Sequence, residues 1–232
     1  GLYFYKSNDV TSSGKNVSCV ECTTSGDQHG LVVRDSVDLQ LISTTIVDAL
    51  SEPALDIDNS GTSFVGTVTI DDMMVSSSST SYSIALESVD ASIHGLDLSG
   101  QSGGMLWKAR GLTASHFTDS VLWENDANCL DLVDHIELIV LGVSLMCDST
   151  SPSLDESHVN FTSSSLTQGA NVSSSFLMKT SSHLRWISSG PLLTPASVSM
   201  DNILDIMWVI DVHTINQNRL NIPFASVNIT FD

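Results

Sequence analysis

The chain has 232 residues, enough for one well-filled domain, and its 27 acidic against 8 basic side chains give a formal charge of −19. Because 41% of the residues are hydrophobic and only 15% are charged, the composition excludes a disordered acidic tail, and the scarcity of Lys and Arg argues against a nucleic-acid binder. No run approaches about 18 consecutive apolar residues, so we expect no membrane-spanning segment.

The chain begins with a short apolar, aromatic segment that predicts a β strand lying outside the repeat described below. This segment comprises Leu2, Tyr3, Phe4 and Tyr5. We expect residues 1–14 to form either an N-terminal cap or a tail donated to a neighbouring subunit, with these four residues in the contact. The first residue is Gly1 rather than Met, which indicates a processed secreted chain or a piece of a longer one.

Four cysteines predict two disulfides, and pairing by proximity in the sequence gives Cys19–Cys22 and Cys129–Cys147. Free buried thiols are the alternative. Redox or zinc chemistry is disfavoured, because the CxxC spacing of the first pair lacks the context of a redox or zinc motif. Disulfides and glycosylation sequons together predict an extracellular or cell-surface location. The sequons begin at Asn16, Asn160, Asn171 and Asn228.

Five short segments alternate apolar and polar residues, and they recur at about 24 residues or twice that spacing. Their first apolar residues are Val37, Val89, Leu112, Ile136 and Leu184. Further apolar segments precede such strands, so each unit holds two or three short strands, which bury their apolar faces only by stacking on the next unit. These preceding segments lie at residues 31–33, 55–57, 84–86, 106–107, 130–132, 159–161 and 177–178.

This spacing predicts a right-handed parallel β-helix, a solenoid with irregular rungs of about 24 residues. Over residues 15–210 the chain resembles the pectate-lyase-like β-helix superfamily, and that resemblance implies a surface protein or a protein active on polysaccharides. A β-sandwich with Ser-rich loops is the alternative, because its strands also recur, every 8–12 residues or so. Residues 211–232 alternate in the β pattern and predict a closing C-terminal strand or cap.

The segment 56–61 is the one that most resembles a calcium loop, because oxygen-bearing side chains alternate and a Gly follows them. Its ligands would be Asp56, Asp58 and Ser60, and we expect no other cofactor. The position of the bidentate Glu in an EF-hand holds Thr67, so an ordinary β turn is the competing interpretation. Weaker versions of the same pattern occur at Asp71-Asp72 and at residues 124–128.

The sequence contains no HExxH, GxSxG or phosphate-binding loop, so we expect no enzyme. A glycoside hydrolase is the main alternative, because carboxylates on neighbouring rungs could converge without a linear motif. The candidates are Asp126, Asp131 and Asp134. Four tryptophans offer surfaces that could stack on sugars: Trp107 and Trp123 are ambiguous, whereas Trp186 and Trp208 are expected in the core or a cap.

The sequence therefore favours an extracellular structural protein, a surface or filament-forming subunit that associates through its β tails and the ends of the coil. Its expected partners are copies of the same chain, with no nucleic acid and no membrane span. The alternative is a β-helix module that binds or hydrolyses glycans.

Overall fold

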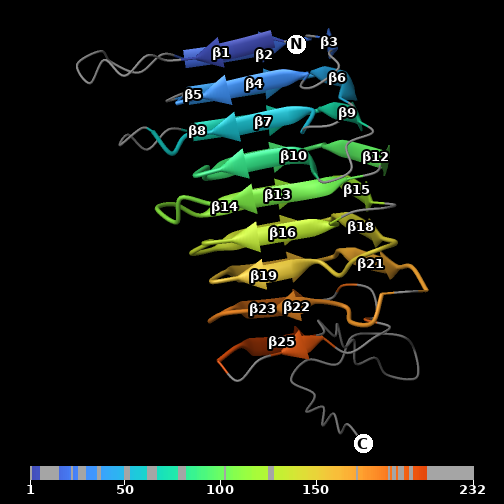
Figure 1. The fold of residues 1–232 in the computed structure, drawn as a ribbon. Helices are drawn as coiled ribbons and strands as arrows, with labels where there is room; N and C mark the ends of the chain where they lie inside the picture. The colour runs from blue at the N-terminus through green and yellow to red at the C-terminus, as the bar shows by residue number, and fades with distance from the viewer. Residues whose placement is uncertain are drawn as a thin grey trace, which may run out of the picture.

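Short runs of Val, Ile and Leu alternating with polar residues form strands that are buried on one face and exposed on the other. The computed structural model describes residues 2–5, 16–21, 23–25, 30–35, 38–49, 53–61, 67–77, 82–101, 103–124, 128–170, 172–187, 189, 192, 196–198 and 201–207. Within these residues every strand pairing is parallel, no residue is helical, and the strands stack into a β-solenoid with a repeat of about 23 residues (Figure 1). The predicted parallel solenoid is confirmed, and the β-sandwich alternative is wrong.

Three parallel sheets form the sides of the solenoid. Sheet A consists of β1 (Leu2–Tyr5), β4 (Leu31–Arg34), β7 (Leu55–Asp58), β10 (Tyr82–Glu87), β13 (Gly104–Lys108), β16 (Leu130–Val133), β19 (Ser153–Asp155), β22 (Leu177–Met178) and β24 (Ser197–Val198). Sheet B consists of β2 (Asn16–Val20), β5 (Asp38–Ile42), β8 (Thr67–Asp71), β11 (Ala91–His94), β14 (Ser115–Thr118), β17 (Leu138–Leu141), β20 (His158–Thr162), β23 (His183–Ile187) and β25 (Ile203–Met207). Sheet C consists of β3 (Thr23–Ser25), β6 (Thr45–Ala49), β9 (Met74–Ser77), β12 (Asp97–Gln101), β15 (Val121–Glu124), β18 (Ser144–Cys147) and β21 (Ser165–Gln168).

The core consists of rows of apolar side chains that run along the solenoid axis, because register partners on successive rungs point the same way. In sheet B one inward row is Leu41, Ile70, Ile93, Phe117, Val140, Phe161 and Trp186, all of them buried. In sheet A the matching row is Val33, Ile57, Leu86, Trp107, Leu132, Leu154 and Met178. Each fully buried Leu, Ile or Phe contributes about 1.5–3 kcal/mol, and stacking covers each side chain with its neighbours from adjacent rungs.

The turn from sheet B to sheet C is only two residues long, and its first residue has a positive φ. That position holds Ser43, Asp72, Gly95, Asp119, Gly142 and Ser163 on successive rungs. The second residue is buried, and a Ser there ties its rung to the previous one: Ser120 Oγ accepts from the Leu96 amide at 3.0 Å and donates to the Thr118 carbonyl at 2.7 Å. Ser164 and Ser189 repeat this bond to the previous rung, so the abundant serines form an internal ladder.

The first position of this turn holds Asp and Gly alternately on four successive rungs: Asp72, Gly95, Asp119 and Gly142. Each Asp carboxylate lies over the Gly of the next rung. At Gly95, where φ is +64°, an added Cβ would lie 2.6 Å from Asp72 Oδ1. We expect Gly95→Ala to lower the free energy of unfolding by about 1–2 kcal/mol in urea titrations, because an L-residue is disfavoured at this φ and the new methyl group would lie too close to the Asp72 carboxylate. The loss should shrink in an Asp72→Ala background, which removes the contact. An unchanged urea midpoint for the single variant would contradict this account.

The five predicted repeat segments overlap strands of sheet B, namely β5, β11, β14, β17 and β23, but Val89, Leu112 and Ile136 lie in the turns before their strands, and Leu112 and Ile136 are exposed. Most of the preceding segments are strands of sheet A, but residues 159–161 belong to β20 of sheet B. The N-terminal segment was expected to lie outside the repeat, whereas β1 pairs in parallel with β4 as the first strand of sheet A. The predicted C-terminal strand, residues 211–232, lies outside the described residues. No helix in the described part of the chain is long and apolar enough to cross a membrane.

Candidate functional site

The outward face of sheet A carries an open groove of about 630 Å³ along its last four strands and the loops that lead into them. We call it the sheet A groove. Its lining is almost entirely hydroxyl, amide and charged side chains, with one exposed leucine at its floor. The lining residues are Asn128, Asp131, Thr150, Ser151, Ser153, Ser173, Ser174, Leu177, Lys179, Ala196 and Ser197.

The floor of the groove follows from the strand register. Asp131, Ser153, Leu177 and Ser197 are register partners on β16, β19, β22 and β24, so they form one outward column. Neighbouring parallel strands lie about 4.8 Å apart, so Asp131, Leu177 and Ser197 offer closely spaced polar and apolar groups to one ligand, while Ser153 is buried beneath them.

Asp131 is held in place by donors from two other rungs. Tyr82 Oη donates to Asp131 Oδ2, and Ser153 Oγ donates to Asp131 Oδ1 at 2.5 Å. Asn128 Nδ2 donates to Tyr82 Oη at 3.0 Å. Burial and the hydrogen bond to Asp131 raise the pKa of Tyr82, so the phenol keeps its proton and remains a donor. The carboxylate is therefore fixed in orientation before any ligand arrives.

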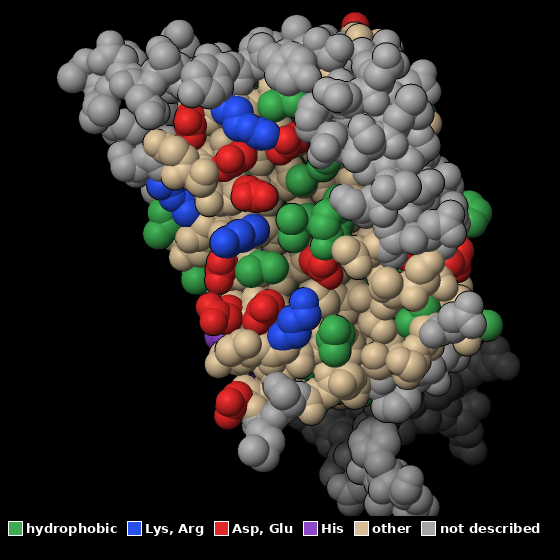
Figure 2. All heavy atoms as spheres, in the orientation of Figure 1, with side chains coloured by type: hydrophobic (Ala, Val, Ile, Leu, Met, Phe, Trp, Pro, Cys, Tyr) green, Lys and Arg blue, Asp and Glu red, His purple; other side chains and the backbone are tan. Residues whose placement is uncertain are grey.

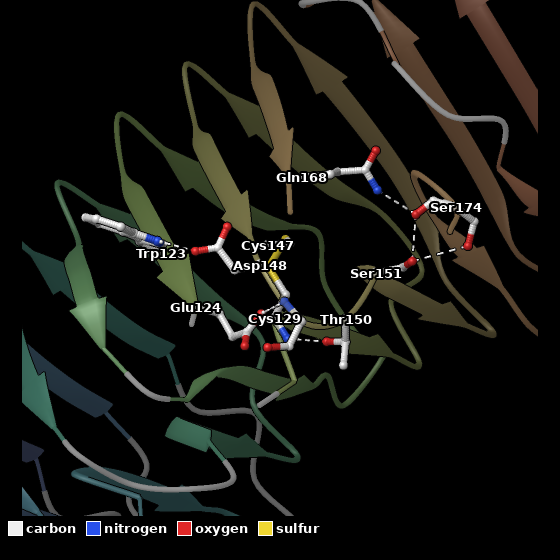
Figure 3. Close-up of a disulfide and its surroundings, with 10 residues drawn as sticks. Trp123, Glu124, Cys129, Cys147, Asp148, Thr150, Ser151, Gln168 and Ser174 are labelled. Atoms are coloured by element: carbon white, nitrogen blue, oxygen red, sulfur yellow. Dashed lines mark hydrogen bonds between the residues drawn. A yellow bond between two sulfur atoms is a disulfide. The ribbon is translucent and has the colours of Figure 1, made fainter. Parts of the chain in front are cut away.

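A disulfide between Cys129 and Cys147 anchors one wall of the groove (Figure 3). It joins the residue before β16 to the end of β18 and confirms the predicted pair. The Cys129 amide donates to Thr150 Oγ1 at 3.0 Å, which places Thr150 at the groove. Glu124 is fully buried, and its Oε2 accepts a hydrogen bond from the Ser149 amide at 3.2 Å. Glu124 belongs to the weaker metal candidate at residues 124–128, and in the structure it positions the loop after β18.

The second wall is the segment around Ser174, between β21 and β22. Ser151 Oγ donates to the Ser174 carbonyl at 2.6 Å, and Gln168 Nε2 donates to the same oxygen at 2.6 Å (Figure 3). These bonds join the loops of successive rungs, so in both walls side chains of one segment hold the backbone of another.

Charged side chains of both signs lie along the outward face of sheet A, above the groove (Figure 2). Arg34 forms a bidentate ion pair with Asp56, and this hydrogen-bonded carboxylate raises the pKa of the guanidinium. Asp58 Oδ1 accepts from the Ser60 amide at 2.8 Å. The structure therefore gives Asp56 and Asp58 partners within the chain, and calcium binding by this segment stays a prediction.

One other cluster brings potential metal ligands together. Asp71, Asp72 and His94 each place a ligand atom within 4.8 Å of the others. Sequence reasoning found the two aspartates but not His94, which is the register partner of Asp71 on the next rung. His94 Nδ1 also lies 3.0 Å from Thr118 Oγ1, so its ring is part of an outward polar row on sheet B.

The remaining sequence candidates are dispersed. In the sequon at Asn160, Asn160 and Thr162 face outward on β20, on either side of the buried Phe161. Asn16 is the first residue of β2. Five further candidates lie outside the described residues: Asn171, Asn228, Cys22, Asp126 and Trp208. Asp134 lies in the turn after β16, 4.0 Å from the Lys108 ammonium. Trp107 and Trp186 are buried in the core, as expected of Trp186, while Trp123 is exposed on sheet C and donates to Asp148 Oδ2 at 3.1 Å.

Of the two candidate catalytic residues that the structure describes, Asp131 lines the groove and Asp134 does not. The groove itself was not found from the sequence, because its residues are contributed by several rungs and share no linear motif. The chain matches no protein-family model, no curated protein and no solved structure.

Proposed function

We propose that the protein is an extracellular β-solenoid that binds neutral glycans in the sheet A groove. The observation that carries this proposal is the carboxylate of Asp131, held in place by the buried hydroxyl of Ser153, near the exposed apolar surface of Leu177 in the same outward column. A sugar ring presents hydroxyls at its edge and C–H groups on its face, so it needs both kinds of surface from its site. Preorganised polar groups keep the ordering cost of binding low.

Charge favours a neutral ligand over an acidic one. The chain carries a formal charge of −19, and the floor of the groove contains the carboxylate of Asp131. A polyuronate would be repelled by both, and Lys179 is the single cation among the lining residues that the structure describes. A neutral oligosaccharide meets no such barrier and can donate its hydroxyls to Asp131.

The lining supports binding rather than hydrolysis. A glycosidase of the usual kind places two carboxyl groups about 5–9.5 Å apart across the scissile bond, and Asp131 is the one carboxylate among the described residues that line the groove. Both of its oxygens already accept hydrogen bonds from Tyr82 and Ser153. These contacts suit a fixed acceptor better than a nucleophile or a proton donor.

Two features support the extracellular assignment. The disulfide between Cys129 and Cys147 is of a kind that persists in oxidising compartments. The sequon at Asn160 lies on an outward strand face, where both Asn160 and Thr162 are partly exposed. An attached glycan would project from sheet B, on a different side of the solenoid from the groove.

The proposal is tested by a glycan array followed by calorimetric titration of the best neutral oligosaccharide. We expect Leu177→Lys to weaken binding at least about tenfold, because an ammonium at the groove floor must be desolvated on binding. Leu141→Lys is the matched control, because Leu141 is 43% exposed on an outward face of sheet B and Leu177 is 39% exposed on sheet A. Wild-type protein without affinity for any neutral glycan, or equal effects of the two variants, would refute the proposal.

A further inference from the structure

Among the described residues at the C-terminal end of the solenoid, one residue of a core row is exposed in each of two sheets, although Leu204, the other inward residue of β25, packs against the core. In the inward row of sheet B, Trp186 is 1% exposed, and its register partner on the next strand, Ile206, is 52% exposed. In the inward row of sheet A, Met178 is buried and its partner Val198 is exposed. Two core rows in different sheets therefore open at the same end of the molecule, at β24 and β25 (Figure 1).

The backbone at this end is open as well. β24 and β25 are the last strands of sheets A and B, and each is paired with another described strand along one edge. The outer edge of such a strand presents hydrogen-bonding groups that can pair with a further strand. Natural edge strands commonly block such pairing with charged side chains, but these two strands contain a single charged residue, Asp205.

Asp205 is itself paired with side chains of β23, the neighbouring strand in sheet B. His183 Nε2 lies 2.9 Å from Asp205 Oδ2, and Arg185 Nε lies 3.6 Å from the same oxygen. The end strands are thus apolar and locally balanced in charge, although the whole chain carries −19. Another acidic molecule can approach this end without meeting a row of carboxylates on the two edge strands.

We propose that this end docks the N-terminal end of a second copy of the chain. Strands β1 and β2 stand first in the same two sheets, at the opposite end of the molecule (Figure 1). Because all the strands are parallel, β1 and β2 of one copy can continue the sheets beyond β24 and β25 of another without reversing any strand. The contact joins two different surfaces, so it repeats head to tail and builds an open filament.

The test uses the full chain, sedimentation velocity over a concentration series and negative-stain microscopy. We expect wild-type protein to form filaments one solenoid wide and Ile206→Lys to need at least tenfold higher concentration to do so. Ile203→Lys is the matched control: Ile203 is 54% exposed on the same strand, but it is the register partner of His183 in an outward row. It should assemble like the wild type, and deletion of residues 1–5 should abolish assembly.

Several outcomes would overturn the proposal. One is a wild-type protein that stays monomeric throughout the series, and another is a closed dimer that grows no further. A third is Ile206→Lys protein that assembles normally but melts at a lower temperature, because Ile206 would then stabilise the fold of its own chain and not the contact between copies.

Discussion

Trp107→Ala should lower the free energy of unfolding by about 3–5 kcal/mol, the largest effect we expect from a single substitution. Trp107 lies on β13 in the inward row of sheet A and is fully buried. Its ring packs edge-on against Phe117, with centroids 6.4 Å apart, and its Nε1 donates to the Val89 carbonyl at 2.7 Å. Truncation leaves a cavity between rungs and removes the donor from a buried carbonyl oxygen.

The measurement is urea denaturation followed by far-UV circular dichroism. Trp123→Ala is the matched control, because Trp123 lies on the outward face of sheet C and is exposed, and its loss should cost less than about 1 kcal/mol. Equal losses for the two variants would mean that the inward rows are not the source of stability.

Acidification from pH 7.5 to 4.5 should remove about 2–3 kcal/mol of stability through His135 alone. His135 lies in the turn between β16 and β17, is 1% exposed, and places its Nε2 3.1 Å from the Trp107 carbonyl oxygen. Its Nδ1 is buried without a hydrogen-bond partner in the structure. Burial lowers the pKa of His135 from 6.5 to about 4, against the opposing influence of Asp90 and Asp134.

The sign follows from linkage. The unfolded chain takes up a proton on this His below about pH 6.5, whereas the folded chain does so only near pH 4, so stability is full above pH 6.5 and falls as the pH drops toward 4. Urea midpoints measured against pH should therefore fall more steeply for the wild type than for His135→Gln. His116→Gln, at an exposed position, should keep the wild-type slope. Identical slopes in all three proteins would contradict a buried, neutral His135.

The repeat was predictable because the strands of sheet B are long enough to show alternation and are preceded by variable polar turns. The strands of sheet C were not located, because a two-residue turn such as Gly142-Val143 joins β17 to β18 and the sequence reads as one apolar run. The parallel solenoid itself follows from the spacing of about 24 residues, because strands of three to five residues that recur at this interval bury one face by stacking on the next unit.

The site was harder to predict for a different reason. Asp131, Tyr82 and Ser153 are far apart in the chain and meet only because rungs stack in register. The role of Asp90 could not be predicted from the sequence either. Its buried carboxylate accepts hydrogen bonds from the amides of residues 110–113 and so holds the loop before β14 in place. The Cys129–Cys147 pair was predictable because its cysteines are close in sequence as well as in space.

Hydrogen–deuterium exchange of the full chain, with and without a saturating neutral oligosaccharide, tests the groove most directly. Peptides covering residues 128–131, 149–153 and 173–179 should exchange more slowly when the sugar is present, while those covering β17 and β20 on sheet B should be unchanged. Slowed exchange confined to sheet B or sheet C, or none at all, would contradict the assignment of the sheet A groove as the glycan site.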